Sequence, residues 1–141
     1  MSSKLIGTWK LIDFIGKDQD SNTVLPFGKK PQGYITFTEN KFMFTTITTS
    51  DRALFETKDR LNAAKDQKAE AFDSHISYCS KYELVENKIL LNVLAASVPN
   101  WVGSFQERFF RFENEKLILE TAPREVDGKK LTMKVSWERA E

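Results

Sequence analysis

The sequence predicts an all-β fold, an eight-stranded antiparallel up-and-down barrel with one helical lid inserted between strands 3 and 4. Three observations carry this prediction. Eight segments are rich in β-branched and aromatic residues with period-two alternation, which is typical of half-buried strands. The connections between them alternate between tight and long. The segment 50–75 shows no such alternation and contains neither Pro nor Gly, which favours a helix.

The predicted strands span residues 9–15, 33–38, 42–49, 77–84, 89–97, 104–112, 117–121 and 131–139. The even-numbered connections are tight turns at 39–41, 85–88 and 113–116, whereas the odd-numbered ones are long or irregular. Successive connections of a meander lie at opposite ends of the sheet, so every tight turn is expected at one end and every elaborate loop at the other. Eight strands close a barrel just wide enough for one small ligand, and closure removes the sheet edges.

The helical insertion covers about 51–75. Apolar and charged residues recur at helical spacing over 64–75, which predicts the helix proper. Because the insertion follows an odd-numbered strand, it belongs to the open end, where we interpret it as a lid. Its many charges are expected to form a solvated face.

The stretch around Trp9 is expected at the closed end. Gly7 allows a close backbone turn, and Trp9 brings a large apolar surface together with an N–H that needs a partner. The last predicted strand ends at the same end of the barrel, which brings Arg139 near Trp9 if the first and last strands pair. An arginine stacked on that indole would contribute about 0.5–2 kcal/mol. Gly7, Trp9 and Arg139 are therefore predicted to be structural.

Length and composition bound the function. The 141 residues predict a single domain over 1–141, and the 21 basic and 20 acidic residues nearly cancel, so no field favours nucleic acid or an anionic membrane. One histidine and one cysteine, Cys79, cannot assemble a metal site or a disulfide. No phosphate-binding glycine loop is present, so we expect no cofactor. No signal-peptide core or membrane span is apparent, which predicts a cytoplasmic protein without membrane insertion. We expect it to be a monomer or a homodimer.

The strand 104–112 carries the main candidate binding residues. Gln106 and Arg108 lie two apart, on one face with Phe110 and Phe112. If this face points inward, the polar pair lies toward the mouth and can hold a ligand carboxylate or polarise a carbonyl. The alternative is a structural Arg108 paired with Glu83 or Asp13. The opposite face also mixes aromatic and charged residues, so the sequence leaves the inward face open.

Further candidates lie near the expected mouth. Asn100 and Trp101 stand in a loop there, where an exposed Trp indicates ligand contact or packing under the helix. Tyr34, Tyr78 and Phe44 are candidate cavity residues on strands. As catalytic candidates we consider Arg108, His75, Tyr78 and Glu83. The alternative for His75 is a solvated side chain favoured by the dipole at a helix C-terminus.

Short motifs over nearly the whole chain also carry a family resemblance. They are Leu5-Ile6-Gly7-Thr8-Trp9-Lys10-Leu11, Pro26-Phe27-Gly28, Gly33-Tyr34, Asp51-Arg52, Ala71-Phe72-Asp73, Tyr78-Cys79, Tyr82-Glu83, Pro99-Asn100-Trp101-Val102-Gly103, Gln106 with Arg108, and Trp137. These motifs resemble the small bacterial and fungal lipocalin-like domain family. The resemblance implies a calycin-type barrel with one cavity. At 91–94 many relatives carry a polar, histidine-containing set where this chain has Leu-Asn-Val-Leu, which implies a more apolar pocket here.

The sequence thus supports three functions. The first is binding of a small, mainly apolar ligand, with or without a carboxylate or carbonyl group, in the barrel cavity. The second is an isomerase or cyclase acting on a small hydrophobic metabolite in the same cavity. The third is a barrel filled solid with side chains that serves as an interaction module, for which a cavity below roughly 300 Å³ would speak.

Overall fold

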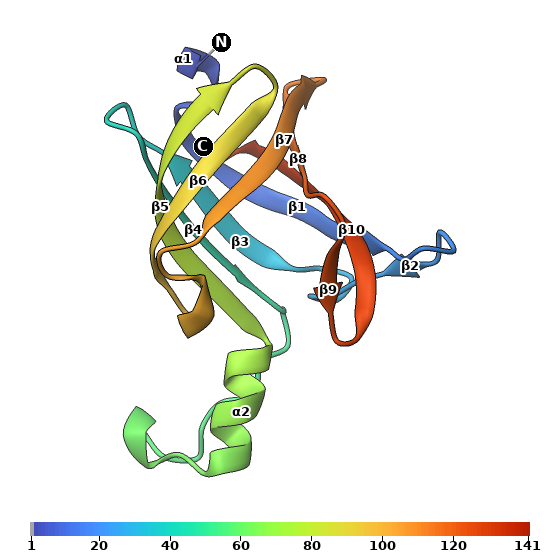
Figure 1. The fold of residues 1–141 in the computed structure, drawn as a ribbon. Helices are drawn as coiled ribbons and strands as arrows, with labels where there is room; N and C mark the ends of the chain where they lie inside the picture. The colour runs from blue at the N-terminus through green and yellow to red at the C-terminus, as the bar shows by residue number, and fades with distance from the viewer. Residues whose placement is uncertain (1) are drawn as a thin grey trace.

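The computed structural model describes residues 2–141, and it forms a closed antiparallel β-barrel (Figure 1). Its strands are β1 (Gly7–Lys17), β2 (Thr23–Val24), β3 (Gln32–Phe37), β4 (Phe42–Thr48), β5 (His75–Val85), β6 (Lys88–Ala96), β7 (Phe105–Glu113), β8 (Lys116–Glu120), β9 (Arg124–Val126) and β10 (Lys129–Arg139). Its helices are α1 (Ser2–Leu5) and α2 (Lys65–Asp73), with 3₁₀ turns η1 (Arg60–Asn62) and η2 (Pro99–Trp101). Among these elements, no helix is long and apolar enough to cross a membrane.

The strand order confirms the predicted barrel. The sheet runs β2-β1-β3-β4-β5-β6-β7-β8-β10-β9, and β1 also pairs with β10 in antiparallel register from Trp9 opposite Arg139 to Lys17 opposite Thr132. Eight long strands therefore close the barrel. The short β2 and β9 extend β1 and β10, and they lie within the predicted loops 16–32 and 122–130.

The predicted segregation of the connections is also confirmed. The tight β3–β4, β5–β6 and β7–β8 turns lie at one end, together with α1, while the long connections lie at the other (Figure 1). Each of the three tight turns contains at least one residue with positive φ, and none of these residues is a glycine. They are Lys41, Glu86, Asn114 and Glu115. Tight hairpin turns require this conformation, so these connections are true turns and not loops.

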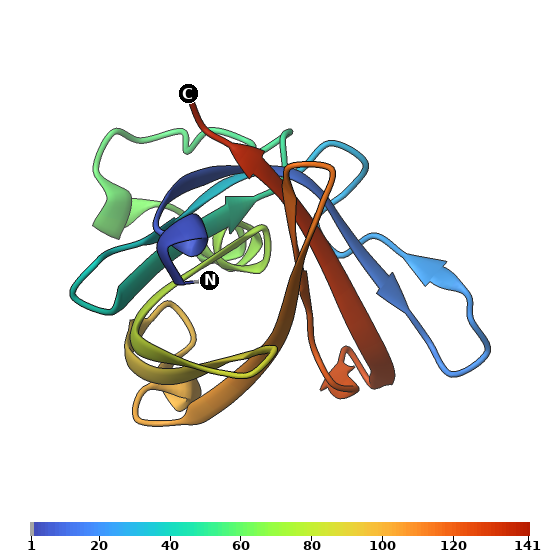
Figure 2. The same ribbon diagram turned by 90° about the horizontal axis from the view of Figure 1, so that it is seen from above.

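The closed end is built around Trp9. Its Nε1–H donates to the Leu5 carbonyl at 3.0 Å, and Leu5 itself is fully buried. The guanidinium carbon of Arg139 lies 4.0 Å from the centre of the Trp9 ring, while Nη1 donates to Ile6 O at 2.8 Å and Nη2 to Lys4 O. Gly7 has φ of +124°, and a Cβ there would lie 2.6 Å from Arg139 Nη1. Figure 2 looks onto this end, with α1 beside the start of β1.

The helical insertion lies between the two long strands predicted on either side of it, but it differs from the prediction in strand number, length and role. Because the short β2 adds a strand, the insertion follows β4 and not the third strand, and its helix covers 65–73 instead of 64–75. None of the nine α2 residues is buried, and the arm formed by 50–74 extends away from the barrel instead of covering its mouth (Figure 1). The physical reason is that α2 is polar nearly all round, so it has no apolar stripe to pack on the rim.

A β-bulge in β1 reverses which residues face the core. Leu11 pairs with Trp137 but Asp13 pairs with Ser136, so Ile12 is the additional residue. Trp9 and Leu11 are buried before the bulge, and Phe14 and Gly16 face inward after it. The second half of β1 thereby contributes Phe14 to the barrel interior at the open end.

Candidate ligand-binding cavity

A cavity of about 390 Å³ opens at the end of the barrel that carries the long connections. Its wall includes residues from the β2–β3 connection, the start of β5, η2 and β9, which all belong to that end. Most of the wall is apolar, with Phe14, Phe27, Ile35, Ile47, Ile76, Leu119, Val126, Met133, Val135 and Trp137. This volume lies within the range of small-molecule sites, so the barrel is not filled solid.

The structure settles which face of β7 points inward. Gln106, Arg108, Phe110 and Phe112 are half-buried, whereas Phe105 is 82% exposed. Phe110 and Phe112 pack against the core, and the Phe112 ring centre lies 6.0 Å from that of Trp9 near the floor. Arg108 is one register step further toward the mouth and lines the cavity. The alternation in β7 therefore places one guanidinium above an aromatic floor.

Arg108 is held by neutral groups. Its Nη2 donates to Gln106 Oε1 at 2.8 Å and to the Tyr78 hydroxyl at 3.2 Å, and its Nη1 donates to the Glu107 carbonyl at 2.9 Å. Neither Glu83 nor Asp13 forms an ion pair with it, and no other carboxylate of residues 2–141 does so. The structural ion pair weighed for Arg108 is therefore not formed. Gln106 orients the guanidinium and does not itself line the cavity.

A second arginine, Arg124 from β9, lines the same cavity. Its guanidinium carbon lies 5.1 Å from the centre of the Trp101 ring, and that ring meets Tyr78 edge to face with centres 5.5 Å apart. Burial, and then the positive charge of Arg108, lower the pKa of Arg124. Trp101 thus packs between Tyr78 and a cation at the mouth and lines the cavity there. Its contact with a ligand stays a prediction.

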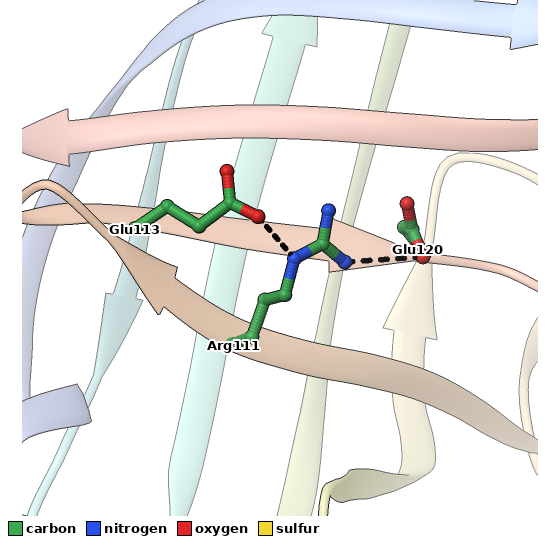
Figure 3. A network of polar contacts seen from close by, with 3 residues as sticks. All are labelled: Arg111, Glu113 and Glu120. Atoms are coloured by element: carbon green, nitrogen blue, oxygen red, sulfur yellow. Dashed lines mark hydrogen bonds and ion pairs between the residues drawn. The ribbon is translucent and has the colours of Figure 1, made fainter.

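An arginine on the outer face of β7 offers a direct contrast. Arg111 Nε lies 2.5 Å from a Glu113 carboxylate oxygen and Nη1 lies 3.2 Å from one of Glu120 (Figure 3). Glu113, and then Glu120, raise the pKa of Arg111. The outward-facing Arg111 is thus paired with two carboxylates. The inward-facing Arg108 is paired with no carboxylate of residues 2–141.

Two further polar groups border the cavity. Thr121 Oγ1 accepts the Met133 N–H at 3.1 Å, which leaves its hydroxyl proton free to donate. The Trp137 indole N–H is buried and has no acceptor among residues 2–141. Asp73 and Glu125 also line the cavity, as exposed side chains at its rim.

Tyr34 and Phe44, predicted as cavity residues, lie on the outside of the barrel. Their neighbours Ile35 and Thr45 face inward, so alternation turns these two rings outward, where each is about half exposed. They line a second hollow of about 580 Å³ on β3 to β6, which shares only Thr45 and Tyr78 with the cavity. Asn100 is exposed in η2 and does not line the cavity.

Two of the four catalytic candidates also lie outside the cavity. In β5 the even-numbered residues Ile76, Tyr78, Ser80 and Tyr82 face inward, which turns His75 and Glu83 outward. Burial, and then the charge of Arg52, lower the pKa of His75. Its Nδ1 has no partner within the described residues. Of the candidates, only Arg108 and Tyr78 come together at the cavity wall.

The sequence prediction missed Arg124 and Phe14. Arg124 lies in a segment expected to be a loop, and no local pattern distinguishes it from the other cations there. Phe14 was not singled out, because the bulge at Ile12 that turns it inward has no sequence signature. No group of three or more potential metal ligands occurs in the part of the chain that the structure describes.

Residues 6–140 match the family model of a lipocalin-like domain. The chain belongs to this lipocalin-like domain family. Among solved structures, two single-site mutants of the fluorescent protein UnaG are similar to this family member. The first is 14% identical with a TM-score of 0.45 and covers 100% of this chain and 99% of its own. The second is 18% identical with a TM-score of 0.40 and covers 99% of both. No curated protein matches the chain.

Proposed function

We propose that this lipocalin-like protein binds a small, mainly apolar ligand in the barrel cavity, with a carboxylate or carbonyl group of the ligand placed against Arg108. The observation that carries the proposal is the cavity of about 390 Å³ whose apolar wall is interrupted by the hydrogen-bonded Arg108–Tyr78 pair. Apolar walls supply affinity through burial, and a few oriented polar groups supply specificity. Neutral partners hold Arg108 in place and leave its charge available to a ligand.

The proposal is tested with N-phenyl-1-naphthylamine, a neutral apolar dye whose fluorescence rises on transfer from water to an apolar site. Ile76 lines the cavity, and its neighbour Ser77 lines the outer hollow. Ile76→Trp is expected to fill part of the cavity and to weaken dye binding by at least about tenfold, which corresponds to about 1.4 kcal/mol. Ser77→Trp is the matched control on the same strand and is expected to leave binding unchanged.

Both variants must show cooperative thermal unfolding near the wild-type midpoint. Unchanged dye binding in a folded Ile76→Trp protein contradicts the proposal. If Ser77→Trp instead weakens binding, the outer hollow is the dye site and the proposal is likewise overturned.

A second function, an isomerase or cyclase, is favoured by one observation. The Tyr78 hydroxyl lies 3.2 Å from the Arg108 guanidinium at the cavity wall, where a phenol can donate a proton to bound substrate. Turnover of a bound ligand that is lost in Tyr78→Phe, with binding retained, supports this function. With His75 and Glu83 outside the cavity, binding is the function that the geometry favours.

A further inference from the structure

Two guanidiniums reach the cavity, and neither has an anionic partner within residues 2–141. Arg108 is hydrogen-bonded only to an amide oxygen, a phenol and a carbonyl. Arg124 packs on the face of Trp101 and forms no ion pair. Arginines removed from water are usually paired with carboxylates, and even the exposed Arg111 on the other face of β7 is paired with two. The cavity wall therefore carries two guanidiniums that are not in ion pairs, while its two carboxylates, Asp73 and Glu125, lie exposed at the rim.

The two arginines act on one region of the cavity. Arg108 donates to the Tyr78 hydroxyl, and Arg124 packs on the Trp101 ring that contacts Tyr78. They are close enough for the charge of Arg108 to lower the pKa of Arg124. The rim carboxylates Asp73 and Glu125 are exposed to water, so solvent screens their charges. An anion between the guanidiniums would relieve their repulsion and supply the missing partner to both.

We propose that Arg124 and Arg108 together bind the acidic group of the ligand, so that the ligand class is an apolar organic acid and not a neutral carbonyl compound. This inference rests on the proposed function and adds a charge requirement and a second binding residue to it. The acid group lies near Tyr78 at the mouth, and the apolar body extends toward Met133 and Trp137. Charge-assisted hydrogen bonds are about twice as strong as neutral ones, which gives the acid its advantage.

The test compares decanoate with 1-decanol as competitors that displace N-phenyl-1-naphthylamine from the wild-type protein. The two have the same alkyl chain and differ in the charged headgroup. Decanoate is expected to displace the dye at a concentration at least about tenfold lower than decanol, since a hydrogen bond between charged groups is stronger than one between neutral groups. Raising the salt from about 0.05 M to about 0.5 M should reduce this preference and leave decanol unaffected.

Variants assign the effect to the two residues. Arg124→Gln and Arg108→Gln are each expected to weaken displacement by decanoate about tenfold and to change displacement by decanol little. Arg124→Lys keeps the charge and should restore part of the preference. Arg111→Gln, an outward arginine of β7, is the matched control and should behave as wild type.

The outcomes separate this inference from the proposed function. If the dye does not bind the wild-type cavity, the proposed function fails and the inference fails with it. If the dye binds but decanoate and decanol displace it equally, or if folded Arg124→Gln keeps the full preference for decanoate, only the inference is overturned. The salt series on wild-type protein tests the charge requirement even where an arginine variant does not fold: a preference for decanoate that salt leaves unchanged overturns the inference.

Discussion

Replacing Arg139 by alanine is expected to destabilise the barrel from its closed end without changing the ligand cavity. The guanidinium stacks on Trp9 and donates hydrogen bonds to the carbonyls of Lys4 and Ile6, so it ties α1 and the start of β1 to the end of β10. Leu5, which accepts the Trp9 N–H and is fully buried, lies between those two carbonyls. Loss of Arg139 therefore loosens the segment that closes the floor.

The magnitude follows from these contacts. One cation–π contact at an exposed site contributes about 0.5–1 kcal/mol. Two hydrogen bonds at about 0.5–1.5 kcal/mol each bring the total to about 1.5–4 kcal/mol. With a urea dependence of about 1–3 kcal/mol per molar, a loss of 2 kcal/mol lowers the unfolding midpoint by about 1 M.

Urea unfolding followed by Trp fluorescence measures this shift. Arg60→Ala, at an exposed arginine of η1, is the control and should leave the midpoint unchanged. Dye binding by Arg139→Ala should match wild type, because the cavity lies at the opposite end. A loss of stability below about 0.5 kcal/mol, which is the usual size of a surface substitution, would refute the reasoning.

Two further predictions concern the arm and the histidine. Replacing residues 51–72 by a short Gly-Ser turn should leave the dye Kd within about twofold of wild type. The turn can close because Thr48 already pairs with His75 across β4 and β5. A larger loss of dye affinity in a folded variant would mean that the arm covers the ligand. Burial, and then the charge of Arg52, lower the pKa of His75 in the folded protein below its usual value of 6.5. At a pH just below 6.5 the unfolded chain therefore binds more protons than the folded one. The free energy of unfolding should fall as the pH drops through this range. His75→Gln should flatten this part of the curve of unfolding free energy against pH, measured by urea unfolding, and an unchanged slope would contradict the assignment.

Several features of the fold were predictable because they depend on local order along the chain. Strand alternation and the rhythm of tight and long connections predicted the eight long strands, the closed barrel and the end at which the mouth lies. The same rhythm places Trp9 and Arg139 at the opposite end, where the β1–β10 register brings them together. Turn chemistry and period-two patterning are properties of a few neighbouring residues, so the sequence displays them directly.

The site was predictable only where alternation alone decides it. Arg108 and Tyr78 were identified as candidates, but so were Tyr34, Phe44, His75 and Glu83, which the same alternation turns outward. Which face of a strand points inward depends on the strands beside it, and in β7 both faces mix charged and aromatic residues. The prediction that the insertion forms a lid was wrong for a related reason. It rested on the position of the insertion at the open end, but α2 has no apolar stripe that could pack on the rim.

The sequence by itself therefore determined the class of fold, the number of long strands and the closed end of the barrel. Only the tertiary structure decided the composition of the cavity wall. The bulge at Ile12 brings Phe14 inside, closure of the barrel selects the inward face of β7, and the β9 hairpin brings Arg124 to Trp101. Residues from β5, β7, η2 and β9 meet there because of long-range pairing, and no local pattern encodes that meeting.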